Sequence, residues 1–313
     1  MKEKLIDLLI CPACLPEEKR LALSIYEREG ADIVSGVLKC NGCGYHYPVR
    51  DGIAFLLPPS SRARSQNSPY ESSPLISSYL WSHYCDIFND QDASRAYVEW
   101  AGRITKGHGI SLDTGCAVGR MTFEMGRKSD FAIGLDNSEG FIRAARSLMT
   151  EGHLDFSIPV EGHIMENRSI FLPEECAREK AEFIVGDALA VPFASNSFSC
   201  LASLNIIDKI TLPVSHLKEI DRLAKRSGAQ FLFSDPFSWS TDVTQEKNWL
   251  GGKESGPCAG EGIENMPAIL KGEKYDLFNP PWKVEEKGYI WWKIRKRRNL
   301  FELIRSCFIK ARR

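Results

Sequence analysis

The sequence predicts an α/β protein, with a mostly parallel sheet, helices on both faces of that sheet, and a small metal-bound unit in front of it. Three observations support this fold class. Segments typical of strands and helices alternate between residues 110 and 234, and such alternation builds parallel sheets. An apolar run ends in an acidic residue and a turn of small residues at 113–119. Two CxxC pairs lie within the first 43 residues, with a spacing typical of a metal site.

The composition is that of a globular protein. A chain of 313 residues, 43% of them hydrophobic, can form one large domain and a small one. The formal net charge of -1 gives no overall attraction to nucleic acid or anionic membranes, although charge can be local. No apolar run approaches the ~20 residues that span a bilayer, and the first residues are charged rather than signal-like. We therefore expect a soluble, cytoplasmic protein.

Residues 1–58 are expected to form a separate zinc-ribbon domain. Each CxxC turn can direct two thiolates at one metal, and tetrahedral Zn²⁺ takes four such ligands. Four thiolates leave no open coordination position, so the zinc is expected to be structural. A core this small needs the metal to be stable. The predicted zinc ligands are Cys11, Cys14, Cys40 and Cys43.

The ribbon also resembles a known family. Residues 9–14 (Leu-Ile-Cys-Pro-Ala-Cys) and 43–53 (Cys-Gly-Tyr-His-Tyr-Pro-Val-Arg-Asp-Gly-Ile) are similar to small zinc-ribbon proteins that bind and activate methyltransferases as a separate subunit. The resemblance implies that a partner of this kind is fused to the ribbon here, and that the ribbon has a docking or stabilising role.

Residues 59–74 are expected to be a linker, because they are rich in Pro, Ser and Asn and lack an apolar period. The second domain then spans 75–313 and opens with helices at 75–84 and 93–104. Its α/β part is expected to contain a strand that ends at Asp113, a helix at 120–128, a strand at 131–136, a helix at 139–149, strands at 182–185 and 199–204, a helix at 213–225 and a strand at 229–234.

Two long segments interrupt this alternation. Residues 150–180 are polar, and residues 236–281 contain Trp239, Trp249 and several glycines. Loops of this length are usually functional, so 236–281 is predicted to be a lid insertion. The tail is expected to end in strands at 289–293 and 307–310, on either side of a basic segment at 295–304 that can form a helix.

Three acids follow the first three strands of the alternating region. Asp113, Asp136 and Asp187 each stand at or just beyond a strand end. Ligands of doubly wound sheets bind beyond the carboxyl ends of the strands, so these carboxylates are expected to meet in one crevice. An acid after the second strand can pair with both hydroxyls of a ribose.

The turn itself favours S-adenosylmethionine over a dinucleotide. Residues 113–119 (Asp-Thr-Gly-Cys-Ala-Val-Gly) fit the pattern acid-x-Gly-x-Gly-x-Gly, with Ala117 in place of the middle glycine. With Gly134-Leu-Asp136 and Gly186-Asp187-Ala188, this segment resembles the class I methyltransferases, which implies a Rossmann-like sheet and S-adenosylmethionine as cofactor. Carried over by position, the predicted cofactor-binding residues are Asp113, Gly115, Cys116, Gly119, Asp136, Asn137, Asp187, Ala188 and Asn205.

A closer resemblance covers most of residues 69–313. Tyr70-Glu71, residues 79–84 (Tyr-Leu-Trp-Ser-His-Tyr), residues 235–239 (Asp-Pro-Phe-Ser-Trp) and residues 246–252 (Glu-Lys-Asn-Trp-Leu-Gly-Gly) look like the C-terminal methyltransferase domain of ovothiol synthases. That domain methylates an imidazole nitrogen of 5-thiohistidine (4-mercaptohistidine). The iron-dependent sulfur-inserting portion of those synthases is absent from this sequence. The thiohistidine, or its selenium analogue, would therefore come from another enzyme, which is a predicted partner.

Methylation of a neutral imidazole nitrogen needs orientation more than acid or base catalysis. Aromatic and polar side chains should therefore dominate the acceptor site, and core packing is the competing explanation for Tyr79, Tyr84 and Trp249. The catalytic candidates are Asp235 and His83. The predicted substrate-binding residues are Tyr70, Tyr79, His83, Tyr84, Asp235, Trp239, Asn248 and Trp249.

Two other functions stay open. The C-terminal segment is basic and contains Trp291 and Trp292, and such patches can follow an RNA backbone. Some ribosomal RNA methyltransferases also join a zinc module to this fold, so RNA base methylation is the main alternative, although nucleic acid is the less favoured partner. The third is a non-catalytic scaffold that binds a partner through the ribbon.

Overall fold

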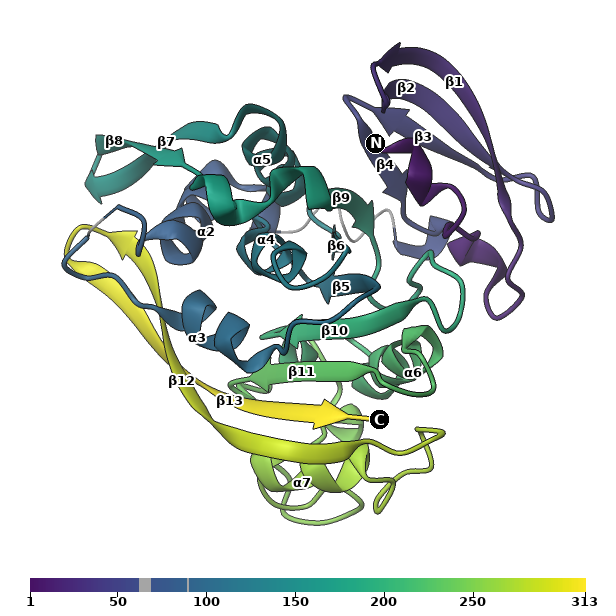
Figure 1. Ribbon diagram of the computed structural model, residues 1–313. Coiled ribbons are helices and arrows are strands. Elements are labelled where there is room, and N and C mark those ends of the chain that lie inside the picture. Colours follow the sequence, from purple (N-terminus) through teal and green to yellow (C-terminus); the bar gives the residue numbers. More distant parts are fainter. Residues whose placement is uncertain (62–68, 89) are drawn as a thin grey trace.

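The computed structural model describes residues 1–61, 69–88 and 90–313, and one mixed sheet of eleven strands organises them. The strand order is β1-β2-β3-β4-β9-β6-β5-β10-β11-β13-β12. Figure 1 shows this sheet passing from the N-terminal ribbon to the C-terminal hairpin. Part of the predicted linker, residues 62–68, lies outside the described residues.

Five parallel strands form the centre of the sheet. β5 lies between β6 and β10, β9 pairs with β6, and β11 pairs with β10, all in parallel. These strands are largely buried on both faces, which explains their nearly continuous apolar sequences. The fold class predicted from the alternation is confirmed. The strand bounds are β5 (Ile110–Thr114), β6 (Phe131–Asp136), β9 (Ala181–Gly186), β10 (Phe198–Leu204) and β11 (Gln230–Asp235).

Helices cover both faces of this sheet. One face carries α2 (Ser73–Tyr84), α3 (Ala96–Arg103), α4 (Arg120–Gly126) and α5 (Glu139–Glu151), and the other carries α6 (Pro213–Leu223) and α7 (Gly262–Leu270). Local signals set the helix ends. The Ser138 hydroxyl accepts the Phe141 N–H at 3.1 Å and caps α5. Gly152, with φ of 78°, ends the same helix in the left-handed conformation.

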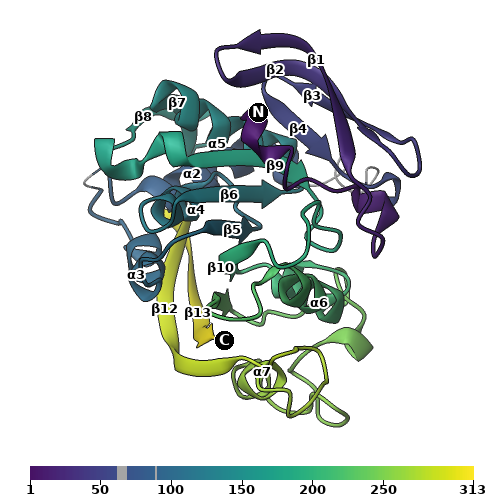
Figure 2. The same ribbon diagram turned by 45° about the vertical axis from the view of Figure 1, so that its right-hand side comes forward.

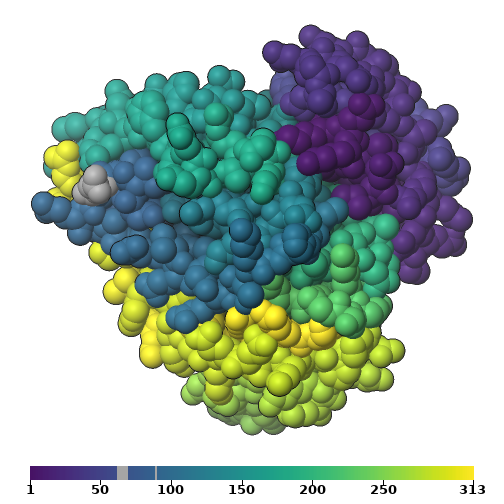
Figure 3. Space-filling view, viewed as in Figure 1, coloured from purple at the N-terminus to yellow at the C-terminus, as the bar shows by residue number. Residues whose placement is uncertain are grey.

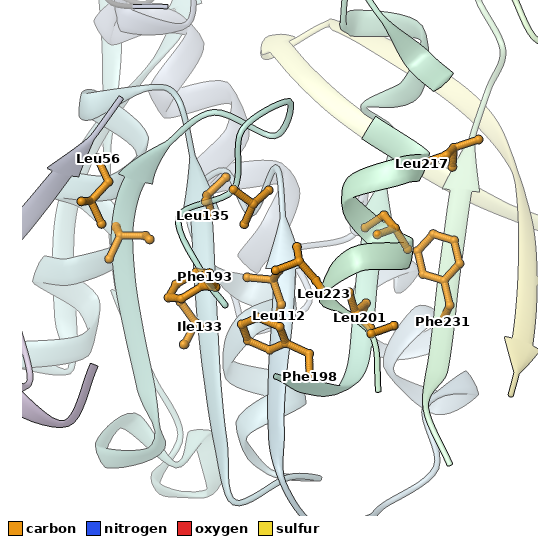
Figure 4. Packing of buried hydrophobic residues seen from close by; sticks show 14 of the residues in the cluster. Leu56, Leu112, Ile133, Leu135, Phe193, Phe198, Leu201, Leu217, Leu223 and Phe231 are labelled. Carbon is orange, nitrogen blue, oxygen red and sulfur yellow. The ribbon is translucent and has the colours of Figure 1, made fainter. Parts of the chain in front are cut away.

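The largest core cluster fills the space between the sheet and α6. Figure 4 shows Leu112, Ile133, Leu201 and Phe231 of the strands lying with Leu217 and Leu223 of the helix. Leu56 of the ribbon belongs to the same cluster. A core that contains residues from both ends of the sheet ties the ribbon to the α/β part.

The ribbon strands continue the sheet instead of forming a detached module. β1 (Leu21–Glu29), β2 (Asp32–Cys40), β3 (His46–Arg50) and β4 (Ile53–Leu56) pair in antiparallel order. β4 then pairs in parallel with β9, with Phe55 opposite Val185 and Leu56 opposite Gly186. Figures 2 and 3 show the ribbon lying directly against the α/β part.

A buried ion pair adds to this junction. Arg146 of α5 lies 2.6 Å from Glu182 of β9 and also contacts Asp32 of β2. Arg146 and Glu182 are almost completely buried, so each charge needs its partner there. The pairing ties the ribbon, α5 and β9 together.

The two insertions have structures of their own. Residues 150–180 contain a separate hairpin of β7 (His153–Glu161) and β8 (Ile164–Phe171). Residues 236–281 carry α7, whose Met266 and Ile269 are fully buried in the largest core cluster. Figure 1 shows α7 beside β12 and β13, at the C-terminal end of the sheet. It therefore contributes to the hydrophobic core.

The C-terminal segment is one long hairpin. β12 (Lys283–Arg297) and β13 (Leu300–Arg312) pair antiparallel along most of their length, and β13 also pairs with β11. The helix expected at 295–304 is therefore wrong. Ile290, Trp292 and Ile294 alternate with more exposed residues, and this period of two buries them against the helices of one face.

Candidate functional site

A cavity of about 880 Å³, its open mouth included, lies at the carboxyl ends of the central strands. Parallel strands bring residues that are distant in sequence to the same sheet edge. The cavity therefore collects most of the predicted cofactor residues. Those that line it are Asp113, Gly115, Cys116, Asp136, Asn137, Asp187, Ala188 and Asn205.

The turn after β5 brings backbone close to the cavity. Gly115 has φ of 74°, and a Cβ built there would lie 2.4 Å from the Ile206 side chain, so a larger residue does not fit. The N–H groups of Gly115 and Cys116 both donate to the Leu135 carbonyl, at 2.8 and 3.1 Å. Ala117 adopts φ of 45°, which shows that alanine is accommodated at the position expected to carry glycine.

Hydrogen bonds from the turn after β5 and from the start of α5 fix the carboxylate of Asp136. Its carboxylate accepts the Ala117 N–H and the Ser138 N–H, both at 2.9 Å. Desolvation raises the pKa of Asp136 to about 6, although these N–H bonds oppose the shift. A carboxylate with a fixed position and free lone pairs is suited to hold the two hydroxyls of a ribose.

Asp113 has a different environment. It is almost completely buried and accepts a hydrogen bond from the Thr122 hydroxyl at 2.8 Å. Burial raises its pKa to about 7, and the nearby charge of Asp136 adds to the shift. Asp187, at the end of β9, accepts the Leu189 N–H at 2.8 Å and is also bonded to the Ser61 hydroxyl.

Binding of S-adenosylhomocysteine is expected to weaken as the pH falls below about 6. Hydroxyl groups donate to the ionised form of Asp136, so the ligand favours the carboxylate, which protonates around its pKa of about 6. Calorimetry from pH 5 to 8 should show the weaker affinity on the acid side. Asp136→Asn should bind weakly and lack this dependence. An unchanged profile in that variant would assign the dependence to another group.

The other half of the cavity is lined by rings. These rings come from η3 (Pro69–Glu71), α2, α3, α5 and β12. They belong to Tyr70, Tyr79, His83, Tyr97, Phe141 and Trp292. The Tyr79 and Phe141 rings lie 4.8 Å apart, and the Tyr79 and Trp292 rings 6.0 Å. The structure therefore brings together three of the predicted substrate residues, Tyr70, Tyr79 and His83.

The remaining predicted residues lie outside the cavity lining. Gly119 (φ 86°) is the N-cap of α4, where a Cβ would meet Phe183 at 2.7 Å. The Tyr84 hydroxyl donates to the Val118 carbonyl at 2.8 Å. Buried Asp235 accepts the N–H groups of Ile207 and Phe237. These three residues have structural partners.

The same holds for the predicted lid residues. Trp239 and Trp249 stack with their rings 6.1 Å apart, and the Trp249 indole donates to the Thr244 carbonyl. Asn248, in η7 (Glu246–Asn248), donates to the Thr211 carbonyl at 3.4 Å. The structure places these three side chains in the packing of the insertion and not in the cavity lining.

Several lining residues were missed. Tyr97 and Phe141 lie within predicted helices, and Trp292 belongs to the basic C-terminal segment on which the RNA alternative rests. Lys209 and Ile210 follow β10, in 3-10 helix η6 (Ile207–Lys209) and just after it. The alternation of apolar and polar residues along β12 was an available signal. Trp292 is two residues from both Ile290 and Ile294, so it points to the same face of the strand, toward the helices.

The four predicted zinc ligands form one cluster. Their sulfur atoms all lie within 4.8 Å of one another. Cys11 Sγ is 3.8 Å from Cys43 Sγ, and Cys14 Sγ is 3.7 Å from Cys40 Sγ. Tetrahedral zinc with Zn–S bonds of about 2.3 Å requires S–S separations of about 3.8 Å. The donor set and its geometry therefore fit a structural zinc ion.

Family comparisons match both parts of the chain. The Trm112p-like protein model matches residues 2–52, and a methyltransferase domain model matches residues 112–232. UPF0434 proteins of Bordetella pertussis and Bordetella parapertussis are 32% identical over 73 residues, which is 23% of this chain and 100% of each relative.

Solved structures are similar at lower identity. A complex of the Haloferax volcanii Trm112 methyltransferase activator with a methyltransferase is 13% identical, with 80% of this chain and 96% of that chain covered and a TM-score of 0.44. A methyltransferase of Bacillus halodurans is 14% identical, covering 69% of this chain and 97% of that chain, with a TM-score of 0.42.

The fold, the turn after β5 and the matched domain define a methyltransferase dependent on S-adenosylmethionine, with a zinc-binding ribbon. Because it spans whole UPF0434 relatives at 32% identity, the chain belongs to the UPF0434 family and carries a methyltransferase domain in the same polypeptide. No helix among the described residues is long and apolar enough to cross a membrane.

Proposed function

We propose that this chain transfers a methyl group from S-adenosylmethionine to an imidazole nitrogen of a small thiol- or selenol-bearing histidine, as in ovothiol or ovoselenol type biosynthesis. The observation that carries the proposal is the half of the cavity lined by rings, which adjoins the proposed cofactor residues. A planar heterocycle packs well between such rings. The sequence resemblance to ovothiol-type methyltransferase domains supports the same acceptor.

The depth of the ring-lined half favours a small acceptor. The side chains of His83, Tyr97 and Trp292 are less than 10% exposed. A small molecule can enter such a chamber whole, whereas a base within RNA stays attached to its backbone. Lys209 lies at the cavity with its side chain 41% exposed. Its ammonium donates to Asp208 at 3.1 Å and to Ser238 at 3.2 Å, and its third N–H is suited to the carboxylate of an amino acid.

The proposed chemistry depends on orientation. S-adenosylmethionine supplies an electrophilic methyl group, which the ring nitrogen takes with its lone pair as the C–S bond breaks and that electron pair stays on sulfur. The methylated ring then loses the proton of its other nitrogen to water. The aromatic side chains hold the ring plane and exclude water from the reacting nitrogen.

A panel of acceptors tests this function. The purified protein is incubated with methyl-labelled S-adenosylmethionine and 5-thiohistidine, its selenium analogue, histidine or total RNA. We expect label in the thiol- or selenol-bearing ring and little in histidine. Asp136→Ala serves as the inactive control. Transfer to RNA alone would contradict the small-molecule proposal.

Domain roles follow from this proposal. We take residues 1–58 as the ribbon, 59–74 as the connection and 75–313 as the catalytic domain, and the enzyme that inserts sulfur or selenium as the upstream partner. The ribbon would stabilise the catalytic sheet through β4. This in-chain arrangement parallels the activator and methyltransferase that are separate chains in the Haloferax volcanii complex.

RNA methylation is the second candidate, because one surface feature favours it. The outer face of β12 and β13 exposes Trp291 at 53%, Leu303 at 59% and Tyr289 at 43%. The Arg305 guanidinium lies 3.7 Å from the Tyr289 ring centre. Aromatic and basic groups on one face can stack bases and contact phosphates. The RNA arm of the panel decides between the two candidates.

A further inference from the structure

The segment that follows β9, residues 187–195, begins with two residues of the cavity lining, Asp187 and Ala188. The segment contains turns and isolated bridges and no helix or longer strand. Its shape therefore depends on the elements that hold it from outside. Because these contacts decide where Asp187 and Ala188 lie, they bear on how the methyl donor is bound.

One stripe of α6 bonds to the backbone of this segment. His216, Glu219 and Arg222 are three residues apart, and side chains at this spacing share one face of a helix. His216 Nδ1 lies 3.0 Å from the Ala188 carbonyl oxygen. Glu219 accepts the Val191 N–H at 2.8 Å, and Arg222 donates to the Val191 carbonyl at 2.8 Å. The helix thus holds successive backbone groups of the segment.

The ribbon holds the other end of the segment. The carboxylate of Glu18 accepts the Ser195 N–H at 2.9 Å and also lies 3.3 Å from the Arg222 guanidinium. The Leu8 carbonyl accepts the Ala194 N–H at 3.0 Å. The segment is therefore held from two sides, by α6 and by the zinc-binding ribbon.

His216 is the member of the stripe that bonds to a cavity residue, and its two partners fix its tautomer. A carbonyl oxygen can only accept, so the ring proton is on Nδ1 and is donated to Ala188. Ser203 Oγ of β10 lies 2.9 Å from His216 Nε2. Burial lowers the pKa of His216, although the bond to Ala188 opposes the shift, so the ring is neutral and Nε2 accepts the Ser203 proton. Both side chains are buried, so each bond is costly to lose.

We propose that His216 is a positioning residue for the methyl donor, whose Nδ1 proton fixes the Ala188 carbonyl and thereby the place of Asp187 at the cavity. His216 does not itself line the cavity, so it acts through the turn. A turn that is held in advance does not have to be ordered when the donor binds, which favours affinity. The inference rests on the donor part of the proposed function and is independent of the acceptor.

Two replacements of His216 separate its two hydrogen bonds. The amide of His216→Asn can take the place of Nδ1 and keep the bond to Ala188, whereas the amide of His216→Gln can take the place of Nε2 and keep the bond to Ser203. Calorimetry with S-adenosylhomocysteine, without an acceptor, measures the affinity. We expect it to stay within about threefold of wild type in His216→Asn and to fall about tenfold in His216→Gln, as for one lost hydrogen bond. Lys218→Ala, at an exposed position of the same helix, is the control and should bind like wild type.

A double variant distinguishes positioning from a general structural role. Asp187→Ala alone should weaken the binding of S-adenosylhomocysteine. If His216 acts through the turn, His216→Gln should cost much less affinity in the Asp187→Ala background than in the wild type, because residues that act through one contact are not additive. Equal costs in the two backgrounds would indicate a general structural role and overturn the inference.

The other outcomes are also decisive. Equal losses of affinity in His216→Asn and His216→Gln, or wild-type affinity in His216→Gln, would overturn the inference. If neither variant folds, Glu219→Ala takes their place, because it removes the acceptor of the Val191 N–H at a partly exposed position. Unchanged affinity in Glu219→Ala would then overturn the inference, and a loss that disappears in the Asp187→Ala background would support it.

The wild-type enzyme separates this inference from the proposed function. A wild type that binds S-adenosylhomocysteine but methylates only RNA would refute the proposed acceptor, and the His216 variants would still decide the positioning role. A wild type that does not bind S-adenosylhomocysteine would overturn both.

Discussion

Replacing Asp136 with alanine is expected to weaken the binding of S-adenosylhomocysteine about 100-fold. The Asp136 carboxylate is fixed at the end of β6 by N–H groups of Ala117 and Ser138, and it lines the cavity. Hydrogen bonds to a charged group contribute about 1.5–3 kcal/mol each. Two bonds to ribose hydroxyls therefore amount to about 3 kcal/mol or more, which corresponds to about 100-fold in affinity. Calorimetry at pH 8, where the carboxylate is ionised, measures the effect.

Two matched variants sharpen this test. Asp136→Asn keeps the shape of the side chain and removes the charge, so its affinity should lie between those of wild type and Asp136→Ala. Asp276→Ala removes an exposed carboxylate that does not line the cavity, and it should bind like wild type. Wild-type affinity in Asp136→Ala would refute the ribose assignment.

The second large effect is expected on thermal stability when the zinc ion is lost. Cys40→Ser should abolish zinc binding and lower the Tm by about 10 °C or more, because structural zinc contributes on the order of 10 kcal/mol to small zinc domains. Cys40 Sγ also accepts the N–H groups of Gly42 and Cys43, at 3.2 and 3.4 Å, as zinc-bound thiolates commonly do. Elemental analysis and thermal unfolding measure the two quantities, with one zinc per chain expected in the wild type.

The control for this variant is Cys200→Ser. Cys200 is a buried thiol of β10, outside the four-cysteine cluster. It should keep a full equivalent of zinc even if its stability falls. Full zinc and an unchanged Tm in Cys40→Ser would contradict the ribbon as a metal site.

The half of the cavity that carries the proposed cofactor residues was predictable, because these residues can be recognised in order along the sequence. Asp113, Asp136 and Asp187 each follow a strand, and parallel pairing guarantees that such positions share one edge of the sheet. The zinc cluster was predictable for a similar reason, since the CxxC spacing itself places two sulfurs together. In both cases, a pattern that can be read from a short stretch of sequence is enough to predict which side chains lie close together in the fold.

The ring-lined half was less predictable, because its walls come from distant segments. Tyr97 of α3 and Trp292 of β12 meet at His83 only after the hairpin has packed on the helices. The opposite error concerns Trp239, Asn248 and Trp249, which the sequence placed at the substrate and which lie outside the cavity lining. Their aromatic and glycine-rich sequence suggested a lid. Instead, the two indoles stack within the insertion, and Asn248 bonds it to Thr211 of the neighbouring loop. Composition alone does not say which face of the sheet a long insertion covers.

The pairing of β4 with β9 has a further consequence. Val185 and Gly186 pair with the ribbon, and the next residue, Asp187, lines the cavity. The ribbon that carries the four-cysteine cluster is thus joined by β-sheet pairing to the strand that leads to the cavity. By thermodynamic linkage, any gain in donor affinity that zinc causes must be matched by an equal gain in zinc affinity when the donor binds. We therefore expect the saturated enzyme to resist chelators better than the free enzyme does.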